Sequence, residues 1–199
     1  MRSFHIVVLA SLLALLGGCA PPIKHMQVSA MAKSAVIQPA QGKALVVFVR
    51  PSDQYQGMQS SVFRVGGDGA ASLIGIMASS TKLAYQAEPG QHLFMAIGED
   101  AGFMTANLQA GRTYYVLIDS QSGHWKARFA LEPVKPALVD SGDFRNSLAN
   151  CVWVEKTADS EQWAHDNRNS IEGKRAKHYP KWQAEPTGKK AALQPEDGR

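Results

Sequence analysis

Short apolar runs separated by turn residues dominate the middle of the chain. The run from Ala44 to Val49 is continuously apolar, which predicts a central strand buried on both faces. Further runs recur at intervals of roughly ten residues, typical of consecutive strands. They predict strands over 61–65, 72–77, 82–87, 91–97, 103–108, 113–118, 125–131 and 150–154. Because no helical pattern intervenes, we expect a mainly β fold: an antiparallel β-sandwich of about eight to nine strands with one C-terminal α-helix.

Three aromatic residues mark the centres of strongly patterned strands. Phe48, Tyr115 and Phe129 hold these positions, so each is expected to be buried. The turns carry their own signals. Glu88-Pro89-Gly90 is typical of a type II turn in which glycine supplies a positive φ. The glycine-rich stretch 66–69 precedes a strand, so it is interpreted as a turn and not as a phosphate-binding loop.

The periodicity changes after the last predicted strand. Residues 157–182 are predicted to form a helix, with Asp159 as N-cap and Pro180 ending it at about Tyr179. Its apolar stripe is thin, consisting mainly of Trp163, Ile171 and Tyr179, so the helix needs a surface to pack against. Residues 183–199 are rich in Pro, Gly and charge and are expected to be disordered.

The first residues carry a targeting signal. Arg2 precedes the apolar stretch Ile6–Leu16, which has the length of a signal-peptide core. The sequence Leu16-Gly17-Gly18-Cys19 then resembles the bacterial lipobox, in which the cysteine is lipidated and becomes the first mature residue. Residues 1–18 are therefore predicted to be a lipoprotein signal peptide, and Cys19 to carry acyl chains such as palmitate. The alternatives are a secretory signal with an incidental cysteine, or an N-terminal membrane anchor.

This hypothesis also predicts the layout of the mature protein. More than one acyl chain on Cys19 would give stable membrane anchoring. Residues 19–41 would form the lipidated N-terminus and a flexible tether, residues 42–156 the β-sandwich domain. Residue 2 of the mature chain would be Ala20 and not Asp, which by the sorting rule of enteric bacteria favours the outer membrane. The expected location is the periplasmic face of that membrane in a Gram-negative cell.

Composition narrows the classes of function. The 199 residues are 45% apolar and 19% charged, which suits one packed domain. The net charge of +4 is too small to indicate nucleic-acid binding. Two cysteines exclude a disulfide-rich scaffold and a four-cysteine zinc site. With Cys19 acylated, Cys151 is expected to be a small buried hydrophobe, and a catalytic or intermolecular cysteine is the alternative.

Sequence motifs for catalysis or cofactor binding are absent. There is no His-Glu-x-x-His, Gly-x-Ser-x-Gly or phosphate-loop motif. The mature histidines lack metal-ligand spacing, and the adjacent carboxylates Glu99 and Asp100 are interpreted as a solvated loop tip. We therefore expect no enzyme activity, no cofactor and no metal. The histidines concerned are His25, His92, His124, His165 and His178.

One basic cluster stands out near the C-terminus. Residues 174–190 hold six Lys or Arg against one Glu. Contact with an anionic surface, such as lipid headgroups or peptidoglycan, is one interpretation. A solvated helix face whose aromatic residues cover the sandwich is the other, which we favour. The candidate contact residues are Lys174, Arg175, Lys177 and Lys181.

Three segments resemble the bacterial lipoproteins that carry domain of unknown function 2846. They are Gly42–Pro51 in the first strand, the turn Glu88–His92, and the strand Leu108–Val116 with its Ala-Gly-x-x-Tyr-Tyr pattern. The resemblance covers about residues 42–132. It implies a β-sandwich like those of peptidoglycan- or sugar-associated envelope modules, with no established enzyme role.

Three hypotheses of function follow, in order of preference. The first is an outer-envelope lipoprotein with a non-catalytic binding or structural module. The second is a lipid-tethered accessory of a secretion or surface-polymer machine, docking through the C-terminal helix. The third is an uncharacterised envelope enzyme. Expected partners are the membrane, through Cys19, and an envelope protein or peptidoglycan, with no nucleic acid.

Overall fold

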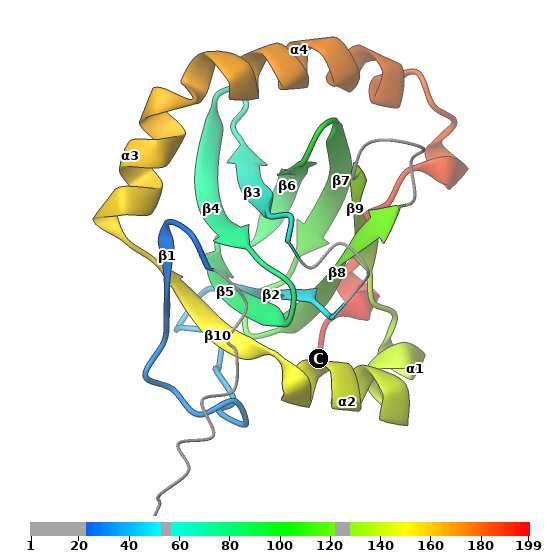
Figure 1. Cartoon of the computed structure of the whole chain (residues 1–199). Helices are drawn as coiled ribbons and strands as arrows, with labels where there is room; N and C mark the ends of the chain where they lie inside the picture. Colours follow the sequence, from blue (N-terminus) through cyan, green and yellow to red (C-terminus); the bar gives the residue numbers. More distant parts are fainter. Residues whose placement is uncertain (1–22, 53–56, 122–127) are drawn as a thin grey trace, which may run out of the picture.

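The computed structural model describes residues 23–52, 57–121 and 128–199 (Figure 1). The strands lie between two sets of helices. The strands are β1 (Met26–Val28), β2 (Ala44–Arg50), β3 (Ser60–Val65), β4 (Ala71–Met77), β5 (Thr81–Ala87), β6 (Gly90–Ile97), β7 (Ala101–Leu108), β8 (Thr113–Gln121), β9 (Arg128–Pro133), β10 (Val152–Lys156) and β11 (Ala192–Leu193). The α-helices are α1 (Pro136–Val139), α2 (Gly142–Asn150), α3 (Ala158–Asp166) and α4 (Arg168–Gln183). Short 3₁₀ helices span Thr187–Lys189 and Pro195–Asp197.

The strands form two mixed sheets. The order β1-β10-β5-β2-β8-β9 makes up what we call the β2 sheet, and β11-β7-β6-β3-β4 makes up the β6 sheet. Three neighbouring pairs are parallel: β2 with β8, β10 with β5, and β11 with β7. The expectation of a purely antiparallel arrangement was wrong. The chain passes from β2 through β3, β4, β5, β6 and β7 before β8 pairs with β2, and these five strands provide the long connection that parallel pairing requires.

The predicted strand segments are confirmed within the described residues. β2 to β8 and β10 each overlap one predicted segment, and β9 matches the part of 125–131 that the structure describes. β1 and β11 are three and two residues long, too short to show a period in the sequence. Gly90 has a φ of +110°, so the residue type at the predicted turn matches its backbone conformation.

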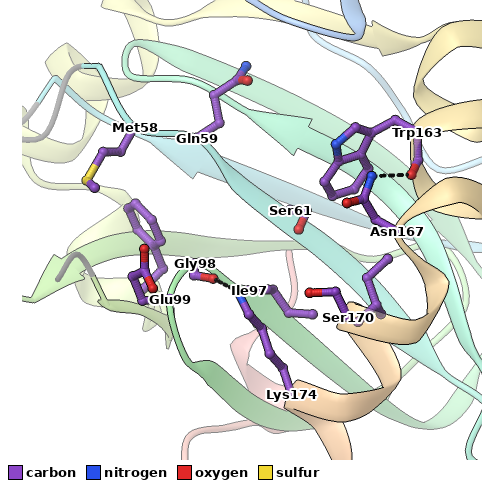
Figure 2. Close-up of a pocket in the computed structure, with 12 residues that line it drawn as sticks. Met58, Gln59, Ser61, Ile97, Gly98, Glu99, Trp163, Asn167, Ser170 and Lys174 are labelled. Carbon is purple, nitrogen blue, oxygen red and sulfur yellow. Dashed lines mark hydrogen bonds between the residues drawn. The ribbon is translucent and has the colours of Figure 1, made fainter.

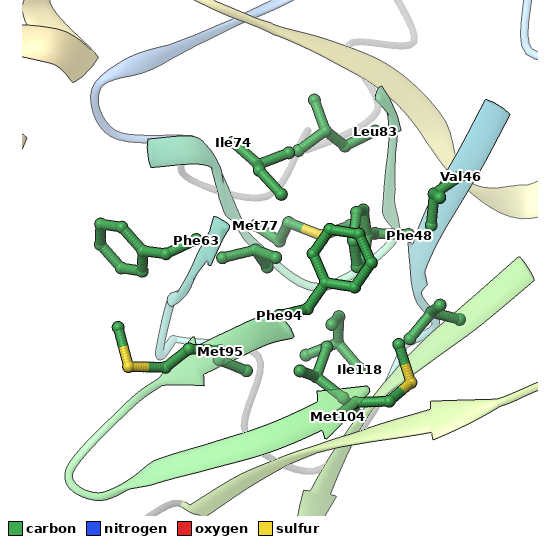
Figure 3. Close-up of a cluster of buried hydrophobic side chains, with 14 of the residues drawn as sticks. Val46, Phe48, Phe63, Ile74, Met77, Leu83, Phe94, Met95, Met104 and Ile118 are labelled. Atoms are coloured by element: carbon green, nitrogen blue, oxygen red, sulfur yellow. The ribbon is translucent and has the colours of Figure 1, made fainter. Parts of the chain in front are cut away.

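Two hydrophobic clusters hold these layers together. The larger lies between the sheets and under α3 and α4, and Figure 3 shows Phe48, Met77 and Phe94 gathered in it. Phe48 and Phe94 meet edge to face, with ring centroids 5.5 Å apart. The smaller cluster, which includes Val47 and Val49, covers the outer face of the β2 sheet. Because alternate residues of β2 point into different clusters, the whole strand is buried, as its continuous apolar run predicted.

The aromatic residue of β8 that enters the core differs from the predicted one. Phe48 and Phe129 are buried as expected, but Tyr115 is only partly buried. Tyr114 is fully buried between the sheets, whereas Tyr115 faces outward and packs on Phe144 of α2. The two tyrosines are adjacent and equally apolar, so their alternation does not show which face of the sheet is the inner one.

The C-terminal helical region consists of two helices, not the single helix predicted, and α1 and α2 between β9 and β10 are further helices that the prediction missed. The N-cap of α3 is Thr157 and not Asp159, because the Thr157 hydroxyl accepts from the Ser160 amide in a capping box. The helix breaks at Asn167, and α4 then continues through Pro180 to Gln183. Pro180 and Ala176 are both exposed, so water can bind the Ala176 carbonyl that Pro180 leaves without a donor.

The apolar stripe of these helices packs against the β6 sheet, as the favoured interpretation predicted. Ile171 is buried, and Trp163, Tyr179 and Trp182 are partly buried against the larger cluster. Phe103 of β7 contacts both Tyr179 and Trp182, at centroid distances of 5.3 and 5.6 Å. In Figure 1, α3 and α4 form an arch over the β6 sheet.

Both ends of the described chain are integrated into the fold, unlike the expected tether and disordered tail. Residues 26–28 pair with β10, and Met26 is buried. At the other end, Leu193 pairs beside β7 and is 1% exposed. The backbone of Arg199 exchanges hydrogen bonds of 2.7 and 3.0 Å with Thr113. Pro, Gly and charge indicated disorder in the tail, and the lack of a sustained period indicated a flexible tether, but each segment docks on a surface that distant strands create.

Candidate ligand pocket

A cavity of about 320 Å³ lies between the α3–α4 arch and the paired ends of β3 and β6. We call it the arch pocket. Figure 2 shows Trp163 and Asn167 on one side of it and Met58 and Glu99 on the other. Its lining comes from separate parts of the chain, namely Met58, Gln59, Ser61, Ile97, Gly98, Glu99, Phe129, Trp163, Asn167, Ser170, Ile171 and Lys174. The pocket therefore exists only when the helices are docked.

The pocket combines aromatic surface with hydrogen-bonding groups. The Trp163 and Phe129 rings supply apolar walls. Asn167 donates its side-chain amide to the Trp163 carbonyl over 2.8 Å, and Lys174 donates to the Gly98 carbonyl, which ties α4 to the end of β6. An apolar wall with a few fixed polar groups is typical of small-molecule sites.

A second hollow of about 270 Å³ adjoins the arch pocket. The two share Gln59, Ser61 and Trp163, and the second is also lined by Lys24 and His25. His25 lies over Trp163 with ring centroids 6.1 Å apart, and its Nδ1 is 2.7 Å from an Asp159 carboxylate oxygen. The pocket thus borders the first described residues of the chain.

The four basic residues predicted to contact an anionic surface divide into two pairs. Lys174 and Arg175 are partly buried and have partners within the fold, since Arg175 Nε lies 2.7 Å from Glu172. Lys177 and Lys181 are exposed. The helix thus directs part of the predicted basic cluster toward the domain itself.

The structure describes one of the two cysteines. Cys19, the predicted lipidation site, lies outside the described residues. Cys151 is 1% exposed, as expected for a small buried hydrophobe, and its thiol lies 3.6 Å from the Arg50 carbonyl oxygen. Burial raises the pKa of the Cys151 thiol to about 11, so it stays protonated and is a poor nucleophile.

The histidines serve local roles where the structure describes them. His92 Nε2 is 2.7 Å from the Glu88 carbonyl, so it closes the turn before β6. His178 lies 3.6 Å from Asp100, and His124 is outside the described residues. Within residues 23–52, 57–121 and 128–199, no three His, Cys, Asp or Glu side chains are grouped to hold a metal ion.

Among the helices of the described ranges, none combines the length and apolar character needed to cross a membrane.

Comparisons with known proteins do not show a family for this chain. No family model matches the chain, and no curated protein matches it. A solved NMR structure of a protein from Eubacterium rectale is similar over 46% of this chain and 88% of its own, with 9% sequence identity and a TM-score of 0.30. At that score the likeness carries no argument about fold or function.

Sequence reasoning did not identify the arch pocket. Trp163 and Ile171 were assigned to an apolar helix stripe, but Gln59, Ser61 and Ser170 stand in unremarkable polar positions. The helical spacing of Trp163, Asn167, Ser170 and Lys174 is the one local signal, since residues three or four apart share a helix face.

Proposed function

We propose that this protein is an outer-envelope lipoprotein whose β-rich domain is a non-catalytic binding module, with the arch pocket as its ligand site. The single observation that carries the proposal is the position of the pocket. It lies beside Lys24 and His25, only a few residues after the predicted lipidation site at Cys19.

The short spacing between anchor and domain is central to the proposal. Ile23 packs against the larger cluster and β1 pairs with β10, and only three residues, 20–22, separate Ile23 from Cys19 in the sequence. At about 3.5 Å per fully extended residue, four steps from Cys19 to Ile23 span at most about 14 Å. Lipidation at Cys19 would therefore place the arch pocket close to the membrane surface.

The lining of the pocket favours a polar ligand that also presents an apolar face. Trp163 can contact the C–H face of a sugar ring, while Ser61, Ser170 and Gln59 can bond hydroxyl groups. The cavity volume of about 320 Å³ is at the lower end of the usual range for ligand sites. Saccharide units of peptidoglycan or of another envelope glycan combine these features.

A binding experiment with purified sacculi and soluble glycan fragments tests this proposal. Trp163→Ala should weaken binding at least tenfold, because it removes the aromatic wall. Trp182→Ala is the matched control, since Trp182 is also a partly buried tryptophan of this region but packs on Phe103 away from the pocket. Equal binding by the parent and both variants, or no binding by the parent, would refute the assignment of the pocket.

The anchor is tested separately. Cys19→Ser should leave an unprocessed precursor in the inner membrane, because no thiol remains to acylate. Fractionation of membranes with and without detergent distinguishes the two forms. A Ser variant that is processed and sorted like the parent would contradict the lipoprotein proposal, whatever the pocket binds.

The accessory hypothesis needs a modified form. Docking through the apolar face of the C-terminal helix would compete with the contacts that Trp163, Ile171 and Tyr179 make with the domain. A partner protein would have to use the exposed side, where Lys177 and Lys181 lie. Loss of partner capture from native membranes after charge reversal at both residues, with the arch pocket intact, would favour this second function.

A further inference from the structure

A smaller cavity on the opposite side of the molecule has a different chemistry. It has a volume of about 190 Å³ and lies on the outer face of the β2 sheet, between α2 and the N-terminal segment 33–37. We call it the lysine pocket. At roughly 30 Å³ per water molecule, it has room for about six waters. Its lining is Lys33, Ser34, Ala35, Val36, Ile37, Val47, Lys82, Tyr115, Arg145, Leu148, Ala149 and Trp153.

The lining of this pocket includes a buried lysine, Lys82. It lies on β5, opposite Val49 of β2 and Trp153 of β10, in a position where an aliphatic residue would pack well. Its side chain is buried, with 2% exposed. Burying an ammonium group is unfavourable unless its partners replace the lost hydrogen bonds to water, so the groups around Lys82 determine whether its charge is stabilised.

The partners of Lys82 within the described residues are neutral. Its ammonium donates to the Lys33 carbonyl over 2.6 Å and to the Leu148 carbonyl over 2.8 Å, and it lies 4.8 Å from the centroid of the Trp153 ring. Leu148 is in the last turn of α2, where free carbonyls and the helix dipole favour a cation. Burial lowers the pKa of Lys82, which indicates that these contacts do not fully replace water.

The pocket as a whole lacks negative charge. Its described lining contains three cationic side chains, Lys33, Lys82 and Arg145, and no carboxylate. The nearest anionic group to Arg145 is Asp140 at 3.6 Å, and Asp140 also pairs with Arg199. An ammonium can form three hydrogen bonds, and two carbonyl acceptors are present, so a ligand anion would find a donor at the pocket wall.

The rest of the lining is apolar and aromatic. Val47, Ile37 and Leu148 supply aliphatic surface, and Trp153 and Tyr115 supply rings. We propose that the lysine pocket binds a small monocarboxylate with an apolar body, whose carboxylate pairs with Lys82 and whose body lies against these side chains. Charge complementarity selects this occupant over a neutral apolar one.

The segment that covers the pocket also belongs to the proposed site. Trp153 Nε1 donates to the Ala35 carbonyl over 3.1 Å, and Lys82 holds the neighbouring Lys33 carbonyl. Val36, which follows Ala35, is 76% exposed. Displacing the segment would break these two hydrogen bonds and the packing of Ala35 and Ile37 on the smaller cluster, and it would open a route of entry to the sheet.

A calorimetric titration of the full-length protein in a neutral detergent tests the proposal, with hexanoate and hexanamide as probes. The two have the same chain length and differ in charge, and a titration into detergent alone corrects for partitioning. We expect hexanoate to bind at least tenfold more tightly than hexanamide. Lys82→Met should abolish that preference, whereas Lys189→Met, which removes an exposed charge outside both pockets, should leave it unchanged.

A second variant keeps the test decisive if Lys82→Met does not fold. Lys33→Gln combined with Arg145→Gln neutralises the two exposed cations and leaves the buried lysine in place. This variant should reduce hexanoate binding several-fold without changing hexanamide binding. Equal binding of the two probes by the parent, no binding by the parent, or an unchanged preference in a folded Lys82→Met variant would each overturn the proposal; if that variant does not fold, unchanged hexanoate binding by the double variant would overturn the role of the pocket's positive charge. None of these outcomes bears on the arch pocket, which lies beyond the β6 sheet.

Discussion

Replacing Ile171 by alanine tests whether α4 is a structural part of the domain. Ile171 is 5% exposed and lies in the larger hydrophobic cluster, beside the arch pocket. The substitution removes three buried carbons, and at about 0.8 kcal/mol per methylene this transfer term is about 2.4 kcal/mol. A residual cavity raises the usual range for Ile→Ala to about 2–5 kcal/mol.

The helix itself gains a little from alanine, by roughly half a kcal/mol, so the expected net loss is about 2–4 kcal/mol. For a domain of this size, each kcal/mol shifts the melting temperature by about 2–4 °C. Thermal unfolding followed by circular dichroism should therefore show a decrease of roughly 4–16 °C.

Lys177→Ala provides the control within the same helix. Lys177 is exposed and gains slightly less helix propensity on change to alanine than Ile171 does, so its change in stability should stay within about 0.5 kcal/mol. If Ile171→Ala melted like the parent, α4 would not be packed on the sheet. The arch pocket would then not exist as described.

Three further predictions concern the backbone, the buried thiol and the C-terminal segment. Gly90→Ala should destabilise by about 1–3 kcal/mol, because φ is +110° while a Cβ would meet no atom within 4 Å. In Gly173→Ala of α4 the added Cβ also meets no atom within 4 Å, and this variant should be more stable than the parent by up to about 1 kcal/mol. Both variants are measured by urea unfolding, and a stability change of the same sign in the two would contradict this reasoning. Because the pKa of Cys151 is raised from 9.0 to about 11, the folded state holds the thiol proton more tightly, so stability should fall as pH rises from about 9 to 11. Urea unfolding of the parent and of Cys151→Ala at the two ends of that window should show a larger loss in the parent, and parallel losses would contradict it. Deletion of residues 191–199 removes Leu193, which is 1% exposed, and should lower the free energy of unfolding in urea by at least about 1.5–3 kcal/mol. An unchanged urea midpoint would mean that β11 does not hold this segment.

Local patterns in the sequence determined the strands and their turns. The continuous apolar run of β2 predicted burial on both faces, and Gly90 predicted a positive φ, because each property depends on residues adjacent in the chain. The apolar stripe of Trp163, Ile171 and Tyr179 likewise predicted a packed helical face. Cys151 within an apolar run predicted a buried thiol.

Tertiary structure decided the features that depend on distant partners. The direction of strand pairing follows from how the chain connects the sheets, so alternation of residues did not show that β2 and β8 are parallel. The adjacent residues Tyr114 and Tyr115 both suit a buried face, and only the position of the second sheet selects Tyr114 for the core. Residues 23–41 and 183–199 lack a periodic pattern because their burial comes from surfaces built by other segments.

Both pockets belong to this second group. The arch pocket joins strand ends near Ser61 and Gly98 to a helix more than sixty residues further along the chain, and the lysine pocket joins the N-terminal segment to β5 and α2. Lys82 follows Thr81 in the sequence as an ordinary polar strand residue. Its buried charge arises because β10, α2 and residues 33–37 close over it, which is a property of the assembled layers and not of any local stretch of sequence.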